Sequence, residues 1–132
     1  MKLILLISFS FLGLLLNAYA LEPAKHMVIA SKRFLQSLDV NVKEKAQFES
    51  LDEERENWHY FPGRFIQPHG RKGLSLKEMT ADQKILAHGL LGSALSHRGL
   101  LEATDIILLE QILFEREGST FRDPELYHVS IF

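Results

Sequence analysis

Apolar residues recur at every third or fourth position in four segments of the chain, the spacing that places them on one face of an α-helix. These segments span residues 22–38, 41–51, 80–95 and 100–117, and each predicts a helix. The second is weaker and rich in charge, which is also typical of a solvated face. Its expected inner residues are Val42, Phe48 and Leu51.

The third helix is expected to follow Thr80, because this residue and Gln83 have the spacing of a capping box. Gly89, Gly92 and Ser96 line one face of the helix. Each glycine costs about 1 kcal/mol of helix stability relative to alanine. That small face either lets another backbone approach closely or lies at a tolerant surface, and the sequence leaves both open.

The fourth helix is apolar on two sides. Ile106 and Leu113 face one way, whereas Leu101, Leu108 and Ile112 face nearly the opposite way. A helix of this kind is sandwiched between other elements. It is therefore predicted to be the central helix of the domain.

The helical periodicity stops over residues 52–73, which hold the only tryptophan and are expected to form a long loop rich in aromatic residues, proline and glycine. Residues 122–125 predict a turn, and residues 127–132 alternate as a β-strand does. The expected partner of this strand is the short segment 58–61. One such pair is marginal in water, so we expect an α+β, predominantly helical domain that is incomplete.

The first 20 residues have the order of a secretory signal peptide: a cation, an apolar run and a small-residue end. The apolar run is about 14 residues, shorter than the roughly 20 that a membrane-spanning helix needs. Cleavage is expected between Ala20 and Leu21, leaving residues 21–132 as a single domain. We therefore expect an exported protein, periplasmic or extracellular, with no permanent membrane anchor after cleavage.

Composition excludes several classes of function. The 132 residues include 15 basic and 17 acidic side chains, so no basic field attracts nucleic acid. The absence of cysteine removes disulfide scaffolds and thiolate zinc sites. The six histidines lack metal-ligand spacing, so no metal is predicted and no cofactor is assigned. There is no serine elbow, phosphate loop or paired nucleophile and base, and catalytic residues stay unknown.

Aromatic and basic residues gather in the predicted loop and form a candidate ligand site. Trp58, His59 and Tyr60 are close in sequence to Arg64 and Arg71. Stacking combined with positive charge suits an anionic or sugar-like ligand. The alternative, which we favour, is that the aromatic residues anchor the loop to the core while the cations stay in solvent.

Glu110 falls on an apolar arc of the fourth helix, where a carboxylate needs a cation, hydrogen bonds or a raised pKa. In a functional role it faces a cleft as a ligand or general acid. In a structural role it pairs with Arg122 or Arg71, and we favour this pairing. Glu110 and Arg122 complete the candidate ligand-binding residues.

Six short segments, in this order and spacing, resemble domain-of-unknown-function family 3500. They are Trp58–Pro62, Lys72–Leu76, Met79–Thr80, Gln83, Leu95–Gly99 and Arg122–Tyr127. The resemblance covers nearly all of the chain from about Phe34 onward.

The resemblance implies an exported protein of unknown function whose full domain is longer and contains a Gly-His-His segment that this chain lacks. The chain is therefore expected to be the N-terminal part of a truncated domain, inactive by itself. The intact domain is expected to be a secreted or periplasmic hydrolase. The alternative is a small, complete helical binding or interaction module without catalysis.

Overall fold

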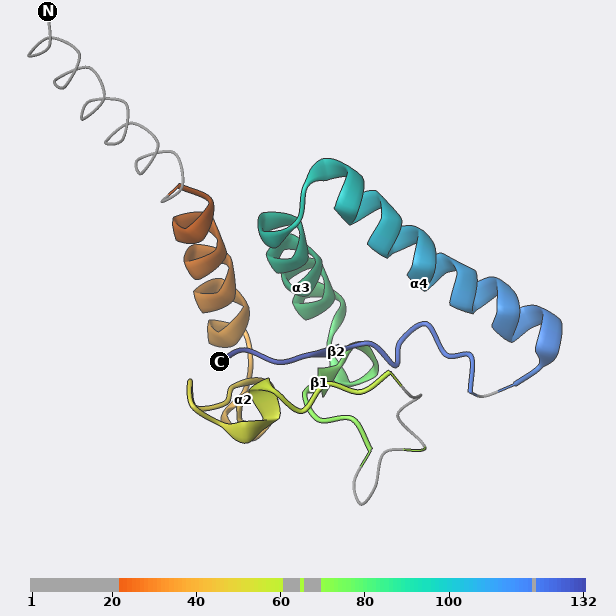
Figure 1. Ribbon diagram of the computed structural model, residues 1–132, viewed down its shortest axis with the longest axis horizontal. Helices are drawn as coiled ribbons and strands as arrows, with labels where there is room; N and C mark the ends of the chain where they lie inside the picture. The colour runs from red at the N-terminus through yellow and green to blue at the C-terminus, as the bar shows by residue number, and fades with distance from the viewer. Residues whose placement is uncertain (1–21, 61–64, 66–69, 120) are drawn as a thin grey trace, which may run out of the picture.

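The computed structural model describes residues 22–60, 65, 70–119 and 121–132 (Figure 1). It begins with a helix over residues 22–36. The elements that follow are α2 (Val40–Ala46), the 3₁₀ helix η1 (Glu53–Arg55), β1 (Leu74–Ser75), the 3₁₀ helix η3 (Leu76–Glu78), α3 (Ala81–Ala94), α4 (His97–Glu117) and β2 (His128–Val129). The protein is α+β and predominantly helical, as predicted. None of the helices in these ranges is long and apolar enough to cross a membrane.

The core lies where the helix over residues 22–36 meets α2, β1, η3 and α3. Its buried apolar side chains are Phe34, Leu38, Ala46, Leu74, Leu76, Met79 and Ala87. The predicted inner position of Leu51 is wrong, because this residue is 92% exposed. Helix α2 ends at Ala46 because Gln47 is extended and forms a parallel bridge with Ile131. Tertiary pairing therefore overrides the helical periodicity in the second half of the 41–51 segment.

A two-stranded antiparallel sheet joins the middle of the chain to its end. In its register, Leu74 is opposite Val129 and Ser75 is opposite His128. The predicted pairing of the terminal strand with residues 58–61 is wrong: residues 58–60 form no strand, and Phe61 lies outside the described residues. The 58–60 segment instead follows η1 as irregular backbone, so its extended appearance in the sequence does not lead to strand pairing.

Beyond β2, the chain end is held by the segment that follows α2. The backbone N–H of Ile131 donates to the carbonyl of Ala46, and the N–H of Phe48 donates to the carbonyl of Ile131, both at 2.8 Å. The rings of Phe48 and Phe132 stack with their centroids 5.2 Å apart. These contacts set the position of the chain end, where Ser130 and Phe132 form part of the site described below.

The start of α3 has the predicted capping box. The Gln83 N–H donates to the Thr80 hydroxyl at 3.3 Å, and the Thr80 N–H donates to the Gln83 side-chain oxygen at 2.9 Å. The two glycines of this helix differ. A Cβ at Gly92 would lie 3.3 Å from the Leu100 side chain of α4, whereas one at Gly89 would meet no described atom within 4 Å. Of these two glycines, only Gly92 is closely approached by another element, and the approaching group is the Leu100 side chain of α4 rather than its backbone.

The prediction of a central, sandwiched α4 is wrong. The helix begins at His97, where the Ser96 hydroxyl accepts from the N–H of Gly99 at 3.1 Å, and it ends at Gly118 with φ +62°. It runs along one side of the molecule, and none of its residues is buried (Figure 1). On the side of Ile106 and Leu113, Leu113 is half-buried, whereas Ile106 is 56% exposed. Three apolar side chains of the other side, Leu101, Leu108 and Ile112, are half-exposed, because no described element packs over them.

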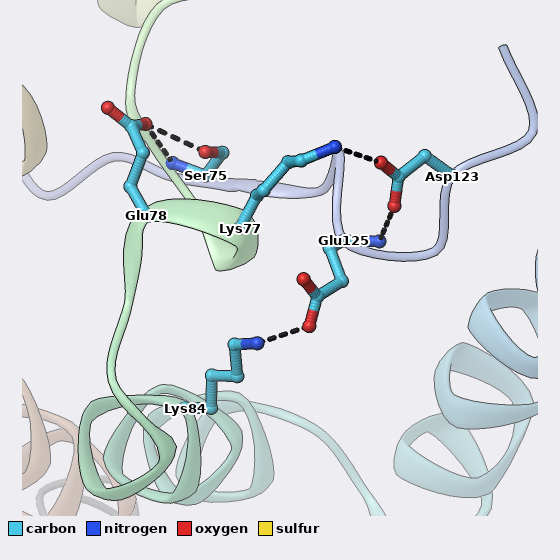
Figure 2. Close-up of polar contacts among 6 residues, drawn as sticks. All are labelled: Ser75, Lys77, Glu78, Lys84, Asp123 and Glu125. Atoms are coloured by element: carbon cyan, nitrogen blue, oxygen red, sulfur yellow. Dashed lines mark hydrogen bonds and ion pairs between the residues drawn. The ribbon is translucent and has the colours of Figure 1, made fainter. Parts of the chain in front are cut away.

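A polar network fastens the turn over residues 122–125 to η3 and α3 (Figure 2). Lys77 pairs with Asp123 at 2.7 Å, and Lys84 pairs with Glu125. The second oxygen of Asp123 accepts from the backbone N–H of Glu125 at 2.9 Å. Backbone bonds from the N–H of Leu76 to Tyr127 and from that of Lys77 to Glu125 continue the attachment. The network therefore fixes where β2 begins.

Candidate functional site

A cleft of about 320 Å³ lies between the segment after η1, the residues before β1, and the C-terminal strand. The polar and aromatic side chains that line it include Trp58, His59, Arg71, Lys72, His128 and Ser130. They come from three places that are far apart in the sequence. The pairing of β1 with β2 brings the second and third of these places together.

Gly73 makes this close pairing sterically possible. Its φ is +100°, in the left-handed region that favours glycine. A Cβ at this position would lie 2.6 Å from the hydroxyl oxygen of Ser130 and 3.0 Å from the carbonyl oxygen of Val129. Only a residue without a side chain therefore lets the backbone after Lys72 approach the strand that forms the cleft wall.

The terminal strand divides its side chains between the core and the cleft. Tyr127, Val129 and Ile131 pack against the hydrophobic core. Their alternate neighbours, His128, Ser130 and Phe132, line the cleft. This is the period of two that an extended strand requires. The strand thus builds the core with one face and the site with the other.

Two polar contacts position the cationic side of the cleft. The Arg71 guanidinium donates to the backbone carbonyl of His59 at 3.4 Å, which links the residues before β1 to the Trp58 segment. The Lys72 ammonium lies 3.3 Å from a carboxylate oxygen of Glu54. Arg55 adds a third cation to the lining, and Glu54 is its only acid among the described residues. The cleft therefore carries a net positive charge.

His128 is a partly buried titratable group in the cleft. Its Nδ1 is buried and has no hydrogen-bond partner among the described residues. Burial lowers the pKa of His128, the Arg71 cation lowers it further, and a backbone contact with Leu126 partly opposes the shift. The lowered pKa favours the neutral imidazole at neutral pH.

Trp58 does not anchor the loop to the core. It is 78% exposed, and Tyr60 is 86% exposed. The interpretation favoured from the sequence, in which these aromatic rings pack inside, is therefore wrong. Exposed apolar rings are costly in water unless something covers them. Trp58 lines the cleft beside the cations, whereas Tyr60 is not among the lining residues.

The remaining candidates fall into two groups. Arg64 and the Ala20–Leu21 cleavage site lie outside the described residues. Glu110 and Arg122 pair at 3.4 Å, and Arg122 also contacts Glu117 at 3.2 Å. This ion pair matches the structural role favoured for Glu110, with Arg122 as the partner, and neither residue lines the cleft.

An open hollow of about 740 Å³ adjoins the cleft and shares Glu54, Asn57 and Lys72 with it. Its lining is largely acidic and consists of Leu51, Asp52, Glu53, Glu54, Glu56, Asn57 and Lys72. Within the described part of the chain, no three carboxylates or histidines are arranged to hold a metal ion. The acids therefore form a negative border beside the positive cleft.

Residues 20–132 match the family model described as protein of unknown function (DUF3500). No curated protein and no solved structure matches the chain. The segments that carried the resemblance in the sequence include the Trp58 segment, the Lys72–Leu76 segment and the Arg122–Tyr127 turn, which form or fasten the cleft. Because the match covers most of the chain, this protein belongs to the DUF3500 family.

Proposed function

We propose that this protein is an exported binding protein whose cleft takes a small anionic ligand with a flat or sugar-like face. One observation supports this most: an exposed tryptophan stands beside two cations in a concave, partly enclosed site. A ligand ring stacked on Trp58 removes apolar surface from water. Its acidic group pairs with Arg71, whose planar fork matches a carboxylate.

The chain offers a direct measurement of such binding. Trp58 is the only tryptophan, so selectively excited tryptophan fluorescence reports on the cleft. We expect glucuronate, an acidic sugar, to change the emission in a saturable manner, and uncharged glucose to do so at much higher concentration. The loss of a charge-assisted hydrogen bond of about 1.5–3 kcal/mol predicts at least tenfold weaker binding for Arg71→Gln.

Matched variants separate binding from folding. Arg33→Gln removes an exposed arginine on the helix over residues 22–36 and is expected to leave the affinity unchanged. Trp58→Phe is measured by calorimetry, because the fluorescent reporter is lost, and is expected to weaken binding severalfold. Equal responses to glucuronate and glucose, or an Arg71→Gln affinity equal to that of wild type, contradict the proposal.

Export is the second part of the proposal. It is supported by the signal-peptide pattern of residues 1–20. The mature protein then begins at Leu21 and resides in the periplasm or outside the cell. Mass spectrometry of the exported protein is expected to give an N-terminus at Leu21. A protein that retains Met1, or that stays inside the cell, contradicts this part of the proposal without touching the binding measurement.

Hydrolysis is a second candidate function, and the neutral His128 beside Ser130 favours it. Both residues line the cleft, and a neutral imidazole is suited to accept a proton. If the cleft hydrolyses a bound ester or glycoside, His128→Asn abolishes turnover while glucuronate binding persists. Binding without turnover of such substrates supports the simpler binding module.

A further inference from the structure

The outward side of α4 carries a regular stripe of six exposed residues, here called the α4 stripe. It consists of Arg98, Leu101, Asp105, Leu108, Ile112 and Glu115. The spacing alternates between three and four residues, which is the repeat by which two helices pack along a common seam. The three apolar members are 52%, 56% and 51% exposed, so the described part of the chain leaves the seam open.

The stripe is complementary to itself when one copy is reversed. An antiparallel second copy sets Arg98 opposite Glu115, which pairs opposite charges at both ends of the seam. Between them Leu101 is opposite Ile112, and Asp105 is opposite Leu108. We propose that α4 is a dimerisation helix that packs antiparallel against α4 of a second copy of this chain, about a two-fold axis.

The same residues disfavour a parallel pair. In that arrangement Arg98 meets Arg98, Asp105 meets Asp105 and Glu115 meets Glu115, so every charged position opposes its own kind. Like charges placed together across an interface are strongly unfavourable. The ends of the stripe decide the orientation, because the two Asp105 residues lie within one helical turn of each other in either arrangement.

The charged ends of the stripe are available for exchange. Arg98 pairs within its own helix with Glu102 at 2.8 Å, and Glu115 accepts a hydrogen bond from the Gln111 side chain at 2.8 Å, but both contacts lie at the exposed surface. Such a surface pair contributes little to stability, so Arg98 can give it up for Glu115 of the second copy. From Arg98 to Glu115 the helix extends about 26 Å. This is a small interface, and we expect a reversible dimer at micromolar concentrations.

Sedimentation velocity of the purified protein over a range of concentrations tests the dimer. Leu108→Glu is expected to abolish it, and Arg98→Glu or Glu115→Arg is expected to weaken it at least fivefold. The double variant Arg98→Glu/Glu115→Arg restores the opposite charges and is expected to return to within about twofold of wild type. Ile85→Glu, at an exposed apolar residue of α3, is the control and leaves the dimer intact.

Orientation is tested by disulfide cross-linking, because the chain has no natural cysteine. A mixture of Leu101→Cys and Ile112→Cys proteins is expected to form a mixed disulfide dimer under mild oxidation. Neither protein alone should cross-link, since identical positions lie about 16 Å apart along the antiparallel seam. A protein that stays monomeric at several hundred micromolar overturns the proposal. So does a dimer that tolerates Leu108→Glu, or one that cross-links through Leu101→Cys alone.

Discussion

At the scale of single residues, some residues of the cleft can be recognised in the sequence and others cannot. Trp58, His59 and Arg71 stand out in the sequence by residue type, and the structure brings these three to one cleft. His128 was missed, although the alternation of the terminal strand places it on the face opposite the core residues. Its role depends on the partner of that strand, which local pattern does not specify.

Gly73→Ala tests the close approach that forms the cleft. The new Cβ would meet Ser130 and Val129 at a backbone conformation unfavourable to alanine, so we expect a loss of about 2 kcal/mol or more in unfolding free energy. Gly89→Ala is the matched control. Its Cβ meets no described atom, and we expect a gain of up to about 1 kcal/mol. Urea unfolding followed by circular dichroism measures both, and equal effects contradict this account of Gly73.

At the scale of elements, local signals were reliable where the chain itself supplies the hydrogen bonds. The helix after Thr80 begins at its capping box because Thr80 and Gln83 satisfy each other's backbone groups. The helix prediction for residues 41–51 was wrong in its second half, because Phe48 and Ala46 form backbone hydrogen bonds with Ile131. The end of this helix is set by a residue far away in the sequence, and the periodicity of the segment carries no information about that residue.

Thr80→Ala is expected to destabilise the protein by about 1 kcal/mol, because the first turn of α3 loses a side-chain acceptor. Thr80→Ser keeps the hydroxyl and is expected to stay within a few tenths of a kcal/mol of wild type. Thermal and urea unfolding provide the measurement. If the alanine and serine variants are equally stable, the cap does not contribute to the fold in the way described.

At the scale of the whole molecule, ion pairs fasten elements that are distant in the chain. Lys45 of α2 contacts Glu78 of η3, and Lys77 of η3 contacts Asp123 of the turn before β2. Hydrogen bonds from Lys45 and Ser75 lower the pKa of Glu78 to about 2. A hydrogen bond from Lys77 and the charge of that residue lower the pKa of Asp123. Protonation of these carboxylates therefore makes the stability of the fold depend on pH.

Stability is expected to fall as the pH drops from about 4.5 towards 2. Glu78 has an ordinary pKa of 4.5, so the unfolded chain takes up a proton first, and the contribution present above pH 4.5 disappears by about pH 2. Glu78→Gln is expected to be less stable at pH 7 and to lose less on acidification. Glu44→Gln, exposed on α2, is the control and should keep the wild-type pH slope. Urea unfolding at several pH values measures this, and identical slopes for all three proteins contradict it.

The sequence by itself determined most of the helical segments, the cap of α3, the turn at residues 122–125, the family and three of the residues that line the cleft, Trp58, His59 and Arg71. Each of these features depends on local spacing or residue type, which can be read directly from the sequence. Only the tertiary structure decided that β1 pairs with β2, that α4 lies at the side with an open apolar seam, and that His128 completes the cleft. Those outcomes depend on which distant segments pack together, and packing depends on the combined burial and hydrogen bonding of many residues rather than on any local pattern.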